Sequence, residues 1–475
     1  MGWFLYFLYF WVNAIKIAPD RSITVYHMSI WGDWAAHFTM GSAMAYRDLF
    51  LSTSPFLIGA PFSYPFVANM ISAVLIRLGV PFFSAFVIPS FLACLFFVGA
   101  LYAFYKTLFK KESIAIIASL IFLWNGGIGF VEYFADIVAS DTPLQTIITP
   151  PREYTHLSKG YVIEWISIIY SMVIPQRAFT LGFPIALLIL ILVHRVYFSD
   201  MKSGWLSRLK KWITRDSTIS GKIIKPSVVA GLLIGFMPIL HSHSFLALGI
   251  IMPIWTIGSI IQRRLQKKSW KESLTPALII AGVSGSIALP IYLIFLDQNV
   301  SHNFFQWFPG WYSKAEDISF IEFWLNNWTI TPLVALLGLI IQLRDSKTAA
   351  EKTKVLTIFF PFFLLFVLLN LVLFQPFIWD NTKILTWASL GISGLAGFTV
   401  VYLWNYKNRA VGIITASCIF FILTAAGAID AWRVIRFELH GVGMYSANDM
   451  ALVDWAKNNT SKDSVWLTGD HHNHW

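Results

Sequence analysis

The chain has 475 residues, of which 57% are hydrophobic and 13% are charged. This composition is too apolar for a soluble protein of this length and indicates a polytopic membrane protein. The formal net charge of +10 does not indicate nucleic-acid binding, because the basic residues gather in short loops between apolar segments. The two cysteines, Cys94 and Cys418, lie far apart inside apolar segments, which argues against a disulfide framework and a cysteine-based zinc site.

Eleven apolar segments approach the roughly 20-residue length that crosses a bilayer. They occupy residues 3–18, 81–105, 113–130, 176–198, 227–241, 244–262, 275–295, 329–343, 355–374, 383–404 and 410–428. The polar run His241-Ser-His-Ser244 interrupts what would otherwise be one long helix, so it predicts a surface turn. The predicted fold class is therefore an α-helical integral membrane protein with about eleven transmembrane helices.

An eleven-span topology places every basic loop on one side of the membrane. The Lys and Arg residues of these loops lie within residues 106–111, 202–225, 263–271, 344–354 and 407–409. The positive-inside rule assigns that side to the cytoplasm, so we expect the N-terminus to be cytoplasmic. We expect the protein to be integral to the cytoplasmic membrane. The loops at 19–80, 131–175, 296–328 and 375–382, the turn at His241 and the tail from residue 429 then face outward. Because long loops tend to be functional, we expect the active site outside.

The composition becomes more polar after residue 429. We predict a transmembrane domain over residues 1–429, with the first outward loop at 19–80, and the start of a soluble extracytoplasmic α/β domain over 430–475. Residues 447–457 read as an amphipathic helix with Ser446 or Asn448 as its N-cap, and residues 462–468 read as a strand. A helix and one strand cannot bury a core, so we expect this domain to continue beyond residue 475.

The first outward loop contains the motif Trp31-Gly-Asp33-Trp-Ala-Ala-His37. If this segment is helical, the four-residue spacing places Asp33 and His37 on one face. A carboxylate beside an imidazole at the lipid–water boundary indicates catalysis, whereas a helix N-cap is the alternative role for Asp33. His37 has three open roles, which are to orient the acid, to bind a metal, or to lie at the interface.

Candidate substrate-binding residues lie at the outward ends of other segments. Arg177 suits either a lipid phosphate or ordinary snorkelling, and Asp380 with Lys383 suits either a substrate contact or a structural ion pair. The remaining candidates are Tyr64, Arg152, His156, His241 and His243. Contact with an acceptor competes with loop capping for Arg152 and His156, and an interfacial turn is the plain interpretation of the two histidines at 241 and 243. The polar end of the chain, at Asp470, His471, His472 and His474, has metal-ligand residue types, but its position favours no site there.

The chain resembles the GT-C class of membrane glycosyltransferases. The likeness rests on the Trp31 to His37 motif, on Ser63-Tyr-Pro-Phe66, and on an odd number of spans with the N-terminus inside. It looks closest to a poorly characterised prokaryotic branch, through four further motifs: Ile174-Pro-Gln-Arg177, His241-Ser-His-Ser-Phe245, Trp379-Asp-Asn-Thr-Lys383 and Gly469-Asp-His-His-Asn473. It departs from the protein-mannosylating type, which has a paired Asp-Glu, and this departure leaves the acceptor open.

The resemblance implies a sugar donor linked to polyprenyl or dolichyl phosphate, with Asp33 as the catalytic acid/base residue. Such a transfer needs a carboxylate to deprotonate the acceptor and cations for the departing phosphate. No Gly-rich nucleotide loop or DxD-type pair is present, which argues against a soluble nucleotide-sugar donor. A divalent metal is neither required nor excluded by the residues.

The predicted function is therefore a glycosyltransferase, transferring a hexosyl or pentosyl group from a lipid phosphate at the outer face of the membrane. Two alternatives from other classes remain, a flippase for a lipid-linked saccharide and a non-catalytic scaffold of envelope assembly. The expected partners are the donor lipid, the bilayer and an unidentified acceptor, with no nucleic acid.

Overall fold

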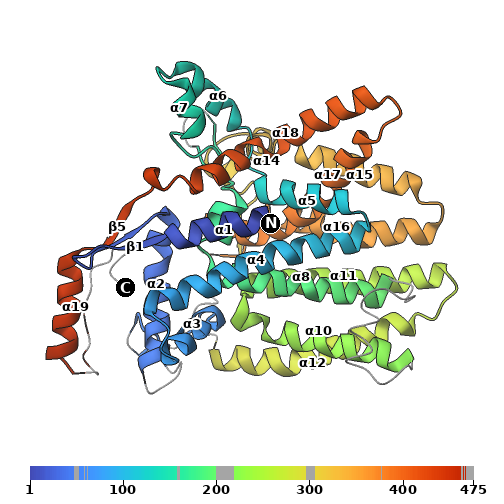
Figure 1. The fold of residues 1–475 in the computed structure, drawn as a ribbon. Coiled ribbons are helices and arrows are strands. Elements are labelled where there is room, and N and C mark those ends of the chain that lie inside the picture. The colour runs from blue at the N-terminus through green and yellow to red at the C-terminus, as the bar shows by residue number, and fades with distance from the viewer. Residues whose placement is uncertain are drawn as a thin grey trace. The chain divides into compact units, whose positions relative to one another are not determined.

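The computed structural model describes residues 1–47, 53–57, 59–60, 62–157, 161–198, 219–295, 305–375, 377–461, 464 and 466. The chain forms two compact units, each assembled from separate parts of the sequence. Figure 1 labels their helices and strands. Unit 1 comprises Met1–Val98, Trp124–Leu181 and Ala425–Trp475, and unit 2 comprises Gly99–Leu123 and Gly182–Thr424. The predicted strand at 462–468 lies largely outside the described residues, as do the basic loop at 202–218 and the chain-end residues Asp470, His471, His472 and His474.

Eight helices of the described chain are long and apolar enough to cross a membrane. They are α4 (Phe82–Phe109), α8 (Arg177–Phe198), α10 (Ile219–Leu240), α11 (Ser242–Leu265), α12 (Lys271–Phe295), α16 (Ala349–Leu369), α17 (Thr382–Trp404) and α18 (Arg409–Val434). The helices α14 (Phe320–Trp328) and α15 (Thr331–Asp345) meet at a short break with a bend of 85°. If this pair is counted as one further span, the described chain has up to nine spans. The chain is thus a multi-pass α-helical membrane protein, as predicted.

Each predicted apolar segment coincides with a helix of the structure. The segments at 3–18 and 113–130 form shorter helices than expected, α1 (Gly2–Asn13) and α5 (Glu112–Trp124). The predicted break is present, because α10 ends at Leu240 and His241 adopts an extended backbone, but α11 already begins at Ser242. His241 and Ser244 are buried, so the surface turn expected over His241 to Ser244 is wrong. The apolar runs therefore predicted the positions of the helices correctly. They did not predict the exact helix ends, which are set by the turns between the helices.

Unit 1 begins with α1, β1 (Ile15–Ile17), β2 (Ile23–Val25), α2 (Met28–Tyr46) and α3 (Val67–Arg77). Its middle part holds α6 (Phe130–Ala139), α7 (Pro143–Ile148) and the π-helix η1 (Ile169–Val173), and its last part η4 (Phe437–Leu439), β5 (Val442–Tyr445) and α19 (Ala447–Asn459). The strands form an antiparallel sheet in the order β1-β2-β5, in which Ile23 pairs with Tyr445. The chain after the last apolar helix therefore folds back onto the first loop.

The helix predicted after residue 446 is present as α19. Ser446 is its N-cap, because the Ser446 hydroxyl accepts a hydrogen bond from the Asp449 N–H and the Asp449 carboxylate accepts one from the Ser446 N–H. This capping box decides between the two predicted N-caps in favour of Ser446.

Unit 2 packs its helices around α17, which is almost entirely buried. Helix α17 contacts α15, α16 and α11, and α10 lies along α12. Close approach is possible because a glycine faces a large side chain, and a Cβ at Gly391 would lie 2.3 Å from the Phe362 ring. Two short strands, β3 (Gln306–Trp307) and β4 (Val372–Leu373), pair beside the four-residue helix α13 (Tyr312–Ala315). The basic connections α4–α5, α11–α12, α15–α16 and α17–α18 lie at one end of this unit (Figure 1).

Candidate functional site

Helix α2 carries Asp33 and His37 and begins at Met28, five residues before the acid. His27 is the N-cap, since its Nδ1 accepts a hydrogen bond from the Ser29 N–H at 3.2 Å. Asp33 lies in the second turn of the helix, so the N-cap role weighed for it is excluded. Its side chain is half-buried, while Trp34 and His37 are buried.

The carboxylate of Asp33 is held by the segment that precedes α8. The Gln176 side-chain amide donates to Asp33 Oδ2 at 2.8 Å, and the Trp34 indole donates to the Pro175 carbonyl at 3.2 Å. Pro175 has no N–H, and the π-helix η1 ends just before it. The Thr180 hydroxyl donates to the Val173 carbonyl at 2.7 Å, which satisfies an acceptor that this irregular turn leaves open. These hydrogen bonds to the carbonyls of Val173 and Pro175 hold the turn in place, and that turn positions the side chain of Gln176.

Arg177 follows Gln176 and is enclosed by neutral acceptors. Its guanidinium donates to Ser90 Oγ at 3.2 Å, Asn69 Oδ1 at 2.7 Å and Ser72 Oγ at 2.6 Å, and the side chain is 4% exposed. The rings of Trp34 and Phe86 lie 5.6 Å and 4.8 Å from the guanidinium carbon, at cation–π distance. One cation thereby ties together α2, α3, α4 and the start of α8.

A small cavity, about 30 Å³ in volume, adjoins this guanidinium. Its lining includes Ala68, Ile71, Val173 and Thr180 besides Arg177, but Asp33 is outside it. A volume of this size holds about one water molecule. This cavity is therefore too small to hold a lipid phosphate beside the Arg177 guanidinium.

His37 and Tyr64 lie together on the same part of unit 1. Their ring centroids are 6.2 Å apart, and Tyr64 is the more exposed of the two residues. Burial, and then the nearby charge of Arg177, lowers the pKa of His37 to about 3. The imidazole is therefore neutral near pH 7, and its Nδ1 has no hydrogen-bond partner among the residues that the structure describes.

The second outward loop contains the other two candidates of unit 1. Arg152 bonds to two carboxylates of α6, with its Nη2 2.8 Å from Glu132 and its Nε 2.8 Å from Asp136. His156 pairs with Glu164 at 3.6 Å, and this interaction raises the pKa of His156. These contacts correspond to the loop-capping interpretation, and a role in acceptor binding stays a prediction.

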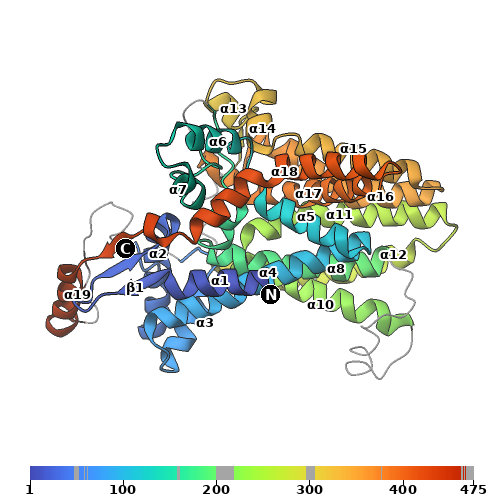
Figure 2. The ribbon, with the colours of Figure 1, turned by 45° about the horizontal axis from the view of Figure 1, so that its top comes forward.

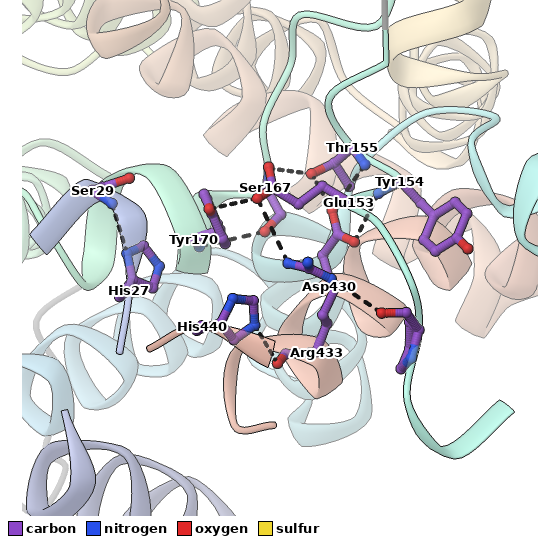
Figure 3. Close-up of polar contacts among 11 residues, drawn as sticks. His27, Ser29, Glu153, Tyr154, Thr155, Ser167, Tyr170, Asp430, Arg433 and His440 are labelled. Carbon is purple, nitrogen blue, oxygen red and sulfur yellow. Dashed lines mark hydrogen bonds and ion pairs between the residues drawn. The ribbon is translucent and has the colours of Figure 1, made fainter. Parts of the chain in front are cut away.

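The same loop is fastened to the end of α18 by Asp430, a residue that the sequence reasoning missed (Figure 3). Asp430 Oδ1 accepts from the Tyr154 N–H at 2.9 Å, and Oδ2 accepts from the Thr155 N–H at 2.8 Å and the Thr155 hydroxyl at 2.6 Å. Glu153 accepts from the Tyr170 hydroxyl at 2.6 Å and lies 3.7 Å from Arg433. An acid inside an apolar helix is a functional signal in a membrane protein, and that signal could have identified Asp430.

The remaining candidates belong to unit 2. His241 Nδ1 and the Ser244 hydroxyl share a hydrogen bond of 2.7 Å, and Gln375 donates to His243 Nε2 at 2.9 Å. Lys383 Nζ lies 3.0 Å from Asp380 Oδ1, which is the ion pair considered for these two residues. All four candidates precede or begin α11 and α17, whose other ends carry the basic connections.

The structure thus brings Asp33, His37, Tyr64 and Arg177 together within unit 1. Gln176 was overlooked as a site residue, although it lies inside the motif Ile174-Pro-Gln-Arg177 that supported the resemblance. Within the described ranges, no three His, Cys, Asp or Glu side chains gather in a way that would hold a metal ion.

Comparisons with known proteins reveal similarity in structure. No protein-family model matches the sequence, and no curated protein matches it either. Three solved structures of an archaeal oligosaccharyltransferase from Archaeoglobus fulgidus are similar to the whole chain. One, in complex with an inhibitory peptide and a dolichol-phosphate, has a TM-score of 0.52 at 10% identity and is matched over 97% of this chain.

The second structure, tethered to an acceptor peptide with the NVT sequon, has a TM-score of 0.51 at 10% identity over 100% of this chain. The third, in the apo form, has a TM-score of 0.51 at 9% identity over 96% of this chain. This chain spans between 58% and 60% of the length of those solved chains. The protein therefore has the GT-C fold of membrane glycosyltransferases, which confirms the resemblance at the level of the fold.

Proposed function

We propose that this protein is a membrane glycosyltransferase that moves a sugar from a polyprenyl-phosphate-linked donor to an acceptor at the outer face of the membrane. The observation that carries the proposal is the carboxylate of Asp33, oriented by Gln176 on a GT-C fold. A dolichol-phosphate accompanies one of the similar structures, which supports a lipid phosphate as the donor class.

In the proposed reaction, the oxygen of an acceptor hydroxyl attacks the anomeric carbon of the sugar, and the Asp33 carboxylate takes the proton of that hydroxyl. The bond from that carbon to the phosphate oxygen breaks, and polyprenyl phosphate leaves with the electron pair. Gln176 holds Asp33 in one orientation throughout. The neutral imidazole of His37 serves as a hydrogen-bond acceptor in the same region. The buried positive charge of the Arg177 guanidinium stabilises anions nearby.

We assign the active site to the extracytoplasmic side of the cytoplasmic membrane. The basic connections of unit 2 lie at the ends of α11 and α17 opposite to His241 and Asp380, so charge and candidate residues occupy opposite ends of the same helices. The positive-inside rule then predicts that the basic ends face the cytoplasm, and from the odd number of predicted spans we infer that the N-terminus also lies there.

The test is the release of polyprenyl phosphate from a labelled lipid-linked sugar by the purified chain in liposomes. Asp33→Asn keeps the size of the side chain but removes the base, so we expect the rate to fall by about 10²- to 10⁴-fold. Asp141→Asn, the same substitution at an exposed acid of unit 1, is the matched control and should keep full activity.

Full activity of Asp33→Asn would contradict the assignment of the base. Movement of the labelled lipid across the bilayer without release of polyprenyl phosphate would instead identify the flippase alternative. Donors carrying hexoses and pentoses should be tested in parallel, because the residues do not select between them.

A further inference from the structure

Helices α6 and α7 form a hairpin and lie side by side in both views (Figures 1 and 2). The hairpin exposes a stripe of apolar side chains. On α6 the stripe follows helical spacing through Val131, Phe134 and Val138, the last of which is 86% exposed. On α7 it continues through Leu144, Ile147 and Ile148. These six residues are called the hairpin stripe below.

The charged residues of α6 point away from the hairpin stripe. Glu132 and Asp136 turn to the opposite side of the helix, where both bond to Arg152, and Asp136 also accepts from the Tyr154 hydroxyl at 2.7 Å. Residues 130–149 contain no Lys or Arg. A helix facing water has its apolar side inward and its charges outward, so α6 has the reverse arrangement. This reversal indicates an apolar environment on the outer side.

The hairpin is also held at the end of a membrane-spanning helix. The Trp432 indole donates to the Ile148 carbonyl at 2.8 Å, and Arg433 Nε donates to the Pro150 carbonyl at 3.2 Å. Both residues lie in the last turn of α18, which is long and apolar enough to cross a bilayer and ends at Val434. A tryptophan at such an end marks the headgroup level of the membrane. The hairpin stripe therefore lies where the bilayer surface meets the protein.

We propose that the α6–α7 hairpin is an interfacial membrane element, which inserts the hairpin stripe between the headgroups and acyl chains at the Val434 end of α18. The partner is the lipid leaflet itself, because the exposed residues are aliphatic or aromatic and continue the apolar surface of a spanning helix. This role does not depend on the proposed sugar transfer. It explains why the carboxylates of α6 turn inward to Arg152, where they also support the loop that Asp430 holds.

The proposal is tested by the environment of single spin labels on the full chain in liposomes of phosphatidylcholine and phosphatidylglycerol. The background is Cys418→Ser, because Cys418 is exposed whereas Cys94 is buried. Val138→Cys and Leu144→Cys report on the hairpin stripe. Ile414→Cys on the exposed side of α18 is the lipid reference, and Asn448→Cys at the start of α19 is the water reference.

Collision with oxygen reports a lipid environment, and collision with a water-soluble nickel chelate reports water. We expect the labels at 138, 144 and 414 all to collide with oxygen several-fold more often than with the chelate. A label at 138 or 144 that behaves like the one at 448 would overturn the proposal. Labels shielded from both reagents would also overturn it, since a protein surface would then cover the stripe.

Discussion

Unit 1 contains two aspartates whose surroundings differ in a way that separates structure from chemistry. Asp430 is 1% exposed, and both of its oxygens accept hydrogen bonds from the backbone of one loop, at Tyr154 and Thr155. Asp33 is half-buried and accepts from the side chain of Gln176. The hydrogen bonds of Asp430 fix the backbone of a loop, whereas the hydrogen bond from Gln176 orients the side chain of Asp33.

The difference shows that an acid near a membrane is not by itself a catalytic group. The groups that an acid binds show whether it fastens a loop of the fold or lies beside a side chain at a candidate site. On this basis Asp430 is an anchor for the second outward loop, and Asp33 is the better candidate for the base.

The sharpest test of this distinction is the substitution Asp430→Ala. It leaves the two buried N–H groups and the hydroxyl without their acceptor, and each buried unsatisfied donor costs about 1 to 3 kcal/mol. We therefore expect a markedly lower thermal unfolding midpoint in detergent, together with faster proteolysis in the loop at residues 150–157. Asp33→Asn is the control and should unfold at the wild-type temperature. Equal stability of Asp430→Ala and the wild type would show that the loop is held by other contacts.

A smaller effect is expected when the partner of Asp33 is removed. Gln176→Leu keeps the bulk of the side chain but loses the amide that donates at 2.8 Å, so the carboxylate becomes less well oriented. We expect kcat for sugar release to fall roughly 10- to 100-fold with little change in KM, since misplacement of a reacting group has costs of this order. Gln176→Asn should recover part of the rate.

Gln375→Leu in unit 2 is the matched control, because Gln375 is also an amide bonded to a site candidate, His243. A loss of activity in Gln375→Leu as large as that in Gln176→Leu would show that the loss is not specific to the partner of Asp33. Wild-type kcat in Gln176→Leu would show that Asp33 needs no positioning by this residue.

The smallest effect concerns the pH dependence contributed by His37. The pKa of His37 is about 3 in the folded protein and lies near 6.5 when unfolded, so the unfolded state binds the extra proton first. The contribution of the neutral His37 to the free energy of unfolding is fully present above pH 6.5. It is lost as the pH falls from 6.5 toward 3, at up to about 1.4 kcal/mol per pH unit. His37→Gln should therefore lose less stability than the wild type between pH 7.5 and pH 5.

His156 provides a control of opposite sign. Its pKa is raised by Glu164, so its contribution is present at low pH and is lost as the pH rises through the folded pKa. His156→Gln should thus steepen the loss of stability on acidification, as measured by unfolding midpoints across the same pH range. If His37→Gln and His156→Gln changed the pH profile in the same direction, the assignment of a buried neutral His37 would be wrong.

The sequence by itself determined the features that depend on neighbours along the chain. Apolar runs of bilayer length located the spanning helices, and the polar residues from His241 to Ser244 predicted the break between α10 and α11. The amphipathic pattern after Ser446 or Asn448 predicted α19. These features are local, because a helix is defined by the hydrogen bonds and apolar faces of residues within a few turns.

The tertiary structure alone decided which polar residues meet. Asp33 and Gln176 are 143 residues apart, and Tyr154 and Asp430 are 276 residues apart. The neutral enclosure of Arg177 by Asn69, Ser72 and Ser90 has no sequence signal, because serine and asparagine within an apolar helix are consistent with many roles. The role of a buried polar group depends on the partners that folding brings to it, and the spacing of residues along a single chain does not specify those partners.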